Sequence, residues 1–278
     1  MGSVESVLYW ITLGIYALGC SGYVYAIVFR NERVFGRLPA LVAAGFLLHT
    51  ATIAALFIET GHLPWAGDYE AALMGCWFII LLTLVVVLRR REHGFIAVGT
   101  VPATLFMMGF GVMRKQDPGP MAASLKTFWL YFHVYFAWLA YGAYTLAMAA
   151  GVVYLLKHRD AARQKKNPIF DRMPPLERLD ELMFRYVTLG FITNAFEMAA
   201  GAIWAKDLWG SYWSWDPLET WALVGWLEYG LFIHLRGSMG WRGVKLAWIS
   251  IVAYIVLFIS FFGVSFAVES SRHIFNMQ

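Results

Sequence analysis

The sequence predicts an all-α integral membrane protein with a single polytopic domain, residues 1–278, and about eight membrane-crossing helices. Apolar residues make up 60% of the chain, whereas Asp, Glu, Lys and Arg together contribute only 14%; a typical soluble domain has about 25% charged residues. The chain also holds 13 tryptophans, more aromatic surface than one soluble core can absorb. The apolar residues, moreover, are gathered into long runs.

These apolar runs have the length that a bilayer requires. About 20 helical residues cross the hydrocarbon layer, and lipid offers the backbone no hydrogen-bond partners, so runs of this length must be helical. We therefore expect eight spans, at residues 7–29, 38–58, 71–88, 94–113, 127–156, 186–205, 217–235 and 246–268.

Basic residues next to the spans predict the orientation. The connections after the first, third, fifth and seventh spans hold 16 Lys and Arg residues, and the opposite side holds five. Because cytoplasmic connections are enriched in Lys and Arg, both termini should lie on the non-cytoplasmic side of the cell inner (plasma) membrane. The longest cytoplasmic connection, about 157–183, is expected to be a solvated connector, with partner docking as the alternative. Within it, Pro174 and Pro175 predict a short helix from Leu176 to Leu179.

Histidines are the candidate ligands, and their predicted depth separates them. The fifth run would form about 45 Å of helix against a hydrocarbon thickness of about 30 Å, so His133, near its start, should lie at the outer interface. His273 follows the last span and should also lie outside, where the two could converge on one metal. His234 comes 17 positions after Pro217, about 25 Å deeper, and would need a second, inner station.

The remaining histidines have weaker functional interpretations. His49 lies in the middle of the second span and is a poorly level-matched partner for His234. His62 is expected in a turn, and His93 and His158 in cytoplasmic connections. For each membrane histidine a packing role stays equally open, although polar groups inside a membrane are costly and therefore often functional.

The densest signal is the tryptophan-rich outer segment, about 207–221, between the sixth and seventh spans. Trp209, Trp213, Trp215 and Trp221 fall within 13 residues. Such flat, polarisable rings suit a planar ligand such as a porphyrin, and Gly210 would permit close approach of the backbone. The competing interpretation is an interfacial aromatic belt, which accounts for Trp209 and Trp221 better than for the cluster as a whole.

Two acids in the same segment have a structural explanation. Asp216 is placed to cap the next helix, Pro217 to be its first residue, and Glu219 to complete a capping box. We favour this role over direct ligand contact, because bare carboxylates would repel the propionates of a porphyrin. Asp216 nevertheless belongs to the candidate cofactor-binding segment.

The stretch WGSYWSWDPLETWAL resembles the WGxxWxWDxxE signature of the WWD haem-handling superfamily. Within it the chain is similar to the CcsA (ResC) family of system II cytochrome c biogenesis. His133 and His273 resemble that family's external histidines, and His234 its membrane histidine. The similarity is strong from about 127 to 273, although Leu218 stands where many relatives carry a basic residue.

The resemblance implies haem transport and presentation, with covalent attachment of haem to apocytochrome c at the outer face. The chain would be a subunit of a thioether-forming holocytochrome c synthase whose CcsB (ResB)-like partner supplies a large outer domain and a fourth histidine. Haem b would be cargo, and the apocytochrome's CxxCH motif would supply the thiols. The implied iron ligands are His133, His273 and, at the inner station, His234; the implied cofactor-binding segment comprises Trp209, Gly210, Trp213, Trp215 and Asp216.

Other functions stay open at this point. A system I protein of the CcmC or CcmF type is the nearest alternative within the superfamily. A cofactor-free transporter could use the intramembrane acids Glu197 and Glu228, and a respiratory b-type cytochrome would have only His49 and His234 to pair. Nucleic acid is not an expected ligand, because no basic tract carries interleaved aromatics. The chain's two cysteines form no CxxC pair, so any reacting thiols must come from a partner.

Overall fold

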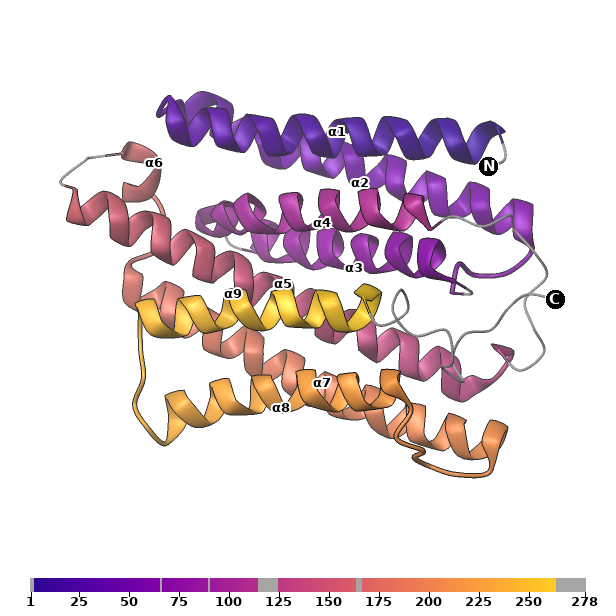
Figure 1. The fold of residues 1–278 in the computed structure, drawn as a ribbon. Helices are drawn as coiled ribbons and strands as arrows, with labels where there is room; N and C mark the ends of the chain where they lie inside the picture. The colour runs from indigo at the N-terminus through magenta and orange to yellow at the C-terminus, as the bar shows by residue number, and fades with distance from the viewer. Residues whose placement is uncertain (1–2, 66, 90, 115–124, 164–166, 264–278) are drawn as a thin grey trace.

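The chain is a helical bundle in a computed structural model that describes residues 3–65, 67–89, 91–114, 125–163 and 167–263 (Figure 1). All regular secondary structure in these ranges is helical, which confirms the all-α prediction. The elements are α1 (Ser3–Val28), α2 (Glu32–Thr60), α3 (Asp68–Arg89), η1 (Arg91–Ile96), α4 (Ala97–Met113), α5 (Phe128–Ala162), α6 (Pro168–Asp171), α7 (Leu176–Trp209), α8 (Pro217–Gly237), α9 (Val244–Phe258) and η3 (Ile259–Gly263).

The predicted membrane spans correspond to these helices. Seven segments of the described chain are long and apolar enough to cross a membrane: α1, α2, α3, Gly94–Met113, α5, α7 and Val244–Phe261. Helix α8 coincides with the predicted seventh span; its 21 residues rise about 31 Å, and it runs antiparallel to α7 and α9, against which it packs (Figure 1). The protein is therefore a multi-pass membrane protein of about eight spans.

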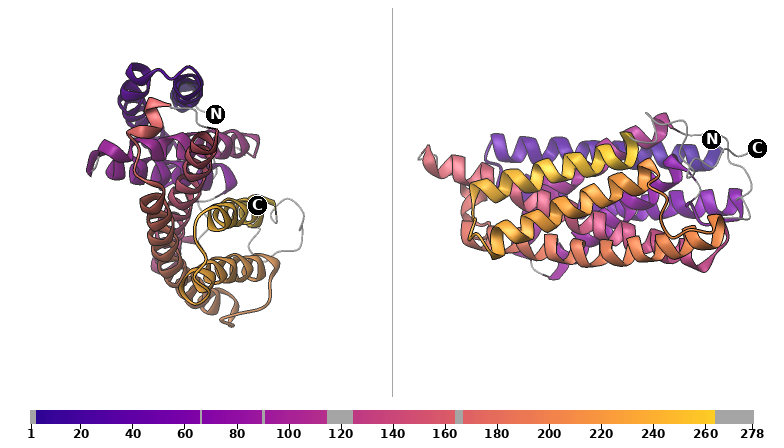
Figure 2. Two further views of the ribbon diagram at one scale, coloured as in Figure 1. Left: turned by 90° about the vertical axis from the view of Figure 1, so that its left-hand side faces the viewer. Right: turned by 60° about the horizontal axis from the view of Figure 1, so that its bottom comes forward.

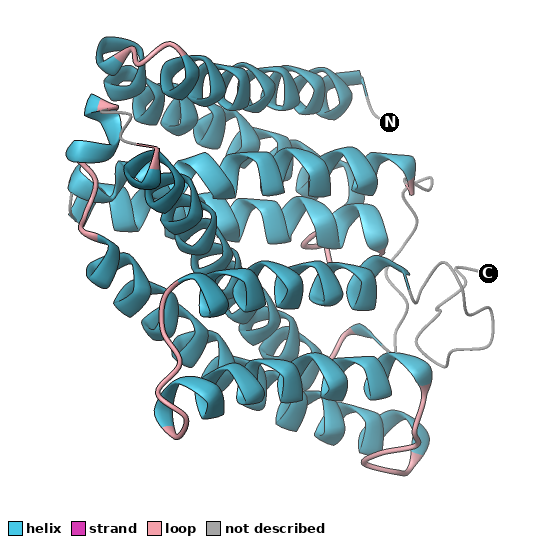
Figure 3. Cartoon of the chain, turned by 60° about the vertical axis from the view of Figure 1, so that its left-hand side comes forward, coloured by secondary structure: helices cyan, strands magenta, loops and turns pink. Residues whose placement is uncertain are grey.

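Helix α5 joins the two halves of the bundle. It packs against α7 and α9 on one side and against α3 and α4 on the other (Figure 2). Close approach of the helices depends on small residues, as is usual in membranes: a Cβ added at Gly99 would lie 2.6 Å from the Cα of Ala149. The described loops gather at the two ends of the bundle (Figure 3). The connection between α7 and α8 lies at one of these ends. We call that end of the bundle the outer end, after the predicted orientation.

The structure corrects the prediction for the connection around 157–183. Helix α7 begins at Leu176, directly after Pro175, but it continues without a break to Trp209, so the predicted short helix is its first turn. The connection is not simply solvated, because Ile169, Phe170 and Met173 are buried. The Lys157 ammonium also donates hydrogen bonds to the carbonyl oxygens of residues in this segment, Phe170, Met173 and Pro174, at 2.8–2.9 Å. Apolar side chains and backbone carbonyls thus fold the connection back onto the bundle.

Candidate functional site

A cavity of about 220 Å³ lies near the outer ends of α5, α7 and α8 and reaches η3. Its walls include residues from segments far apart in the sequence: His133, Glu197, Trp204, Trp213, Trp221 and Phe261. The structure therefore brings His133 and part of the tryptophan segment together at one site.

The imidazole of His133 is held in one orientation. Its Nδ1 lies 2.9 Å from the backbone oxygen of Glu197 and 3.8 Å from the carboxylate oxygen Oε1 of the same residue. A carbonyl oxygen only accepts hydrogen bonds, so Nδ1 carries the hydrogen. The ring lies directly on Gly201, where an added Cβ would come within 2.8 Å of Nδ1. Nε2 has no hydrogen-bond partner among the described residues and is left with a lone pair.

A chain of buried polar groups continues from His133 into the bundle. The Glu197 side chain accepts a hydrogen bond from the amide nitrogen of Asn194, and the Tyr144 hydroxyl donates to the Asn194 amide oxygen at 3.4 Å. The Tyr144 ring stacks on Tyr229 with centroids 3.4 Å apart. The sequence assigns Asn194 no role and offers Glu197 only as a candidate transport residue, so neither is predicted as part of a haem site.

A signal for this arrangement does exist in the sequence. Asn194, Glu197, Gly201 and Trp204 recur at helical spacing, which places them on one face of α7. All four line the cavity. The pattern shows a shared face, but it does not reveal that the face is turned towards His133.

Helix α7 ends at the tryptophan segment. Gly210 adopts the left-handed conformation with φ of 79°, and its amide donates to the Lys206 carbonyl oxygen, the usual arrangement that terminates a helix at glycine. A Cβ built at Gly210 would meet no atom within 4 Å, so the glycine is explained by the backbone turn. Trp209 packs against Trp204, with ring centroids 5.8 Å apart, rather than lining the cavity.

Trp213 and Trp215 differ sharply in their surroundings. Trp213 lines the cavity, and its indole Nε1 is buried with no hydrogen-bond partner in the described part of the chain. Trp215 is 69% exposed, has a φ of 59° and packs edge-on against Trp213 at 5.7 Å. A positive φ is strained for a bulky residue, and such strain is often stored at functional sites.

The two acids of the segment cap α8, as predicted. Asp216 accepts a hydrogen bond from the amide of Leu218 at 3.0 Å, and Glu219 accepts from the amides of Asp216 at 3.2 Å and Ser214 at 2.8 Å. The capping box is thereby complete. Contact between Asp216 and a bound cofactor stays a prediction.

The other histidines are placed as follows. His234 is exposed on the inner part of α8 and does not line the cavity, in keeping with a separate station. His49 is fully buried, with Nε2 3.1 Å from the Leu73 carbonyl oxygen and Nδ1 3.3 Å from the Tyr16 hydroxyl, so both its ring nitrogens are engaged. His273 lies outside the described residues, and its proximity to His133 stays a prediction.

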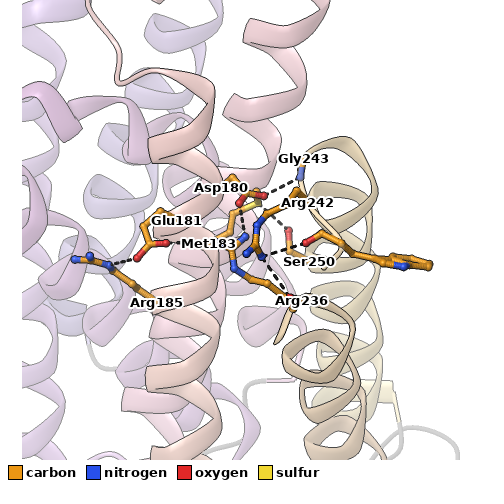
Figure 4. Close-up of polar contacts among 9 residues, drawn as sticks. Asp180, Glu181, Met183, Arg185, Arg236, Arg242, Gly243 and Ser250 are labelled. Carbon is orange, nitrogen blue, oxygen red and sulfur yellow. Dashed lines mark hydrogen bonds and ion pairs between the residues drawn. The ribbon is translucent and has the colours of Figure 1, made fainter. Parts of the chain in front are cut away.

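A buried ion pair of Arg236 and Asp180 anchors the inner end of α8 (Figure 4), two positions beyond His234. Arg236 donates hydrogen bonds to Asp180 and, at 3.3 Å, to Glu181. Asp180 also accepts from the amide of Gly243 at 2.8 Å. These contacts tie α7, α8 and the start of α9 together near His234.

Comparisons with known proteins agree on one family. The family model described as cytochrome C assembly protein matches residues 65–270. The cytochrome c biogenesis protein CcsA of Parasynechococcus marenigrum (strain WH8102) is 30% identical over 255 residues, 83% of each chain. CcsA of Synechococcus sp. (strain CC9605) is 29% identical over 255 residues, 83% of this chain and 84% of that protein. CcsA of Guillardia theta is 29% identical over 238 residues, 78% of each chain.

A solved structure shares the fold. The cytochrome c haem lyase CcmF superimposes with a TM-score of 0.69 over 93% of this chain, at 18% sequence identity. This chain spans 46% of that protein. The likeness shows a common helical architecture, while the family model and the sequence relatives decide the family. The chain belongs to the cytochrome c assembly proteins, and within them to the CcsA cytochrome c biogenesis family.

Proposed function

We propose that this chain presents haem at the outer face of the cell inner membrane for covalent attachment to apocytochrome c, as the CcsA subunit of a synthase with a CcsB-like partner. The observation that supports this most directly is the shared cavity of His133 and Trp213. An imidazole nitrogen is a usual ligand of haem iron, and indole rings pack favourably against a flat aromatic ligand.

The residues of the cavity fit one face of the porphyrin. Nε2 of His133 is available to the iron, and the unpartnered Nε1–H of Trp213 can donate to an acceptor on the ligand. The cavity measures about 220 Å³, below the roughly 300–1,000 Å³ of typical small-molecule sites. The described walls thus account for one side of the site, and in our proposal His273 and the partner protein complete it.

In the proposed reaction this chain holds the reactants rather than supplying a reacting group. His133 and His273 would cap the iron on its two faces and leave the vinyl groups exposed. Each thiol of the apocytochrome's CxxCH motif adds across one vinyl group: sulfur bonds to one carbon, the hydrogen goes to the other, and no oxidant is consumed. The apocytochrome histidine then replaces one capping imidazole. Positioning two reactants in this way can lower the activation barrier by about 7–11 kcal/mol.

His234 would serve the earlier step. Its exposed position on α8 is consistent with haem b arriving from the inner half of the membrane. The level-matched ligand would come from the CcsB-like partner, because His49 has both ring nitrogens engaged within this chain. The same engagement of His49 disfavours the b-type cytochrome alternative.

Single-histidine variants test the proposal. His133→Gly should lose the outer-site share of the haem, seen as a weaker absorbance spectrum of the purified protein and a lower pyridine-haemochrome content per protein, and added imidazole should restore both. His158→Gly, an exposed histidine near the inner end of α5, is the matched control and should retain the haem. An unchanged spectrum in His133→Gly would rule out axial ligation by that residue. Co-purification with a CcsB-like protein separates the proposal from a system I function.

The transporter alternative has weaker support. Glu197 lines the cavity, but Glu228 does not, so the two acids do not share this path. A protein purified without haem, with and without its partner, would favour that alternative.

A further inference from the structure

Glu197 is a buried carboxylate inside a membrane-crossing helix. Glu197 is only 4% exposed. Burying a carboxylate costs free energy unless hydrogen bonds offset it, and acids that persist inside a membrane are therefore often functional. The carboxylate has two neighbours that matter here: the Asn194 amide nitrogen at Oε2 and His133 Nδ1, 3.8 Å from Oε1.

The directions of these hydrogen bonds follow from the donors available. The Tyr144 hydroxyl donates to the Asn194 amide oxygen, which turns the amide nitrogen towards Glu197. Asn194 therefore donates to one carboxylate oxygen and leaves the other facing His133. Nδ1 of His133 therefore faces two acceptor oxygens of Glu197: the backbone oxygen at 2.9 Å, which accepts its hydrogen bond, and the carboxylate Oε1 at 3.8 Å, which is in charge contact beyond hydrogen-bond distance.

An imidazole whose Nδ1 faces only acceptors keeps its hydrogen on Nδ1. Its Nε2 then carries the lone pair, and this is the nitrogen with no hydrogen-bond partner in the described residues. Ligand histidines commonly use such a partner to fix their tautomer and ring orientation, and loss of that partner typically weakens binding by about 10–100-fold.

We propose that Glu197 is a positioning residue that holds His133 in the tautomer able to bind haem iron, and that Asn194 orients Glu197 for this task. The inference rests on the proposed function, because it assigns a role to Glu197 only if His133 is an iron ligand. In this proposal the buried hydrogen-bonded residues Tyr144, Asn194 and Glu197 orient the imidazole of His133 at the outer site.

The substitution Glu197→Gln tests the hydrogen-bond direction at constant side-chain size. The Asn194 amide nitrogen would still donate to the new carbonyl oxygen, which turns the new NH₂ group towards Nδ1–H of His133. Two donors then face each other, which disfavours the ligating tautomer although the backbone oxygen of residue 197 still accepts from Nδ1–H. Because that hydrogen bond remains, we expect the lower end of the usual range, about tenfold weaker haem retention, measured by transfer of haem to apomyoglobin. Glu228→Gln is the matched control and should behave like the original protein.

A double variant provides the reverse test. In Asn194→Asp combined with Glu197→Gln, the new carboxylate accepts from both the Tyr144 hydroxyl and the new amide group. The carbonyl oxygen at position 197 then faces His133 again, and haem retention should recover. A loss that the second substitution does not reverse would overturn the hydrogen-bond mechanism.

Imidazole rescue supplies a measurement that a packing defect would not change. His133→Gly and His133→Gly/Glu197→Gln are compared by the imidazole concentration that restores half of the haem absorbance. We expect the double variant to need about tenfold more. Equal concentrations, or a Glu197→Gln protein that keeps its haem, would overturn the role of Glu197 while leaving ligation by His133 intact. Only an unchanged spectrum in His133→Gly itself would overturn the proposed function.

Discussion

The buried pair of Arg236 and Asp180 allows a sharp prediction about stability. Both residues are 6% exposed, and Asp180→Ala would leave the guanidinium with Glu181 as its remaining carboxylate partner, at 3.3 Å. It would also leave the Gly243 amide without its acceptor. Removing one member of a buried pair costs about 3–5 kcal/mol. Because Glu181 is retained, we expect the lower end, near 3 kcal/mol.

This free energy converts to a measurable change in melting temperature. One kcal/mol corresponds to about 2–4 °C in a protein of roughly this size, so Asp180→Ala should lower the apparent melting temperature by about 6–12 °C. The assay is the fraction of detergent-solubilised protein that stays monodisperse after heating, followed by size-exclusion chromatography.

Arg185→Ala is the matched control for this experiment. Arg185 also pairs with Glu181, at 2.7 Å, but its side chain is 58% exposed, and helical surface pairs contribute only about 0.3–0.5 kcal/mol. The control should therefore shift the melting temperature by about 1–2 °C. Equal shifts in melting temperature in the two variants would refute the reasoning, because burial would then not increase the contribution of the Asp180–Arg236 pair to stability.

Two further predictions concern the tryptophan segment. Trp215→Gly removes the penalty of about 1–2 kcal/mol for a side chain at positive φ but also the edge-on contact with Trp213, worth about 0.5–1.5 kcal/mol, so stability should change little while haem retention falls; a large fall in melting temperature would contradict the strain. Trp213→Phe keeps an aromatic ring but removes the Nε1–H group, and loss of one hydrogen bond of about 0.5–1.5 kcal/mol should weaken haem retention roughly 2- to 10-fold. Unchanged haem transfer to apomyoglobin would show that Nε1 does not contact the ligand.

Hydropathy predicted the membrane spans well because length and apolarity are properties of the sequence alone. It failed at the start of α7, where Glu177, Asp180 and Glu181 interrupt the apolar run although the helix already begins at Leu176. Asp180 and Glu181 are accommodated in the helix by Arg236, a partner distant in sequence. No window along the chain can contain both members of such a pair.

For the candidate site as well, local features could be predicted from the sequence, whereas features that depend on tertiary contacts could not. The surplus length of the fifth span predicts that His133 lies towards the outer interface, which stays a prediction, and in the structure His133 and Trp213 line one cavity. The four tryptophans could not be separated from sequence, because a membrane belt and a ligand wall use the same residue. Their roles differ through tertiary contacts: Trp209 packs on Trp204, whereas the indole Nε1 of Trp213 is buried at the cavity without a described partner.

Helix α7 connects the two stations of the proposed haem path. Its inner part carries Asp180, which anchors α8 next to His234, and its outer part carries Glu197, which contacts His133. These two acids are 17 positions apart, about 25 Å along the helix, the same depth that separates His234 from Pro217 on α8. Each acid thus lies near the level of one predicted iron ligand. A single rigid helix can in this way keep His133 and His234 in register, although His234 does not line the cavity of His133.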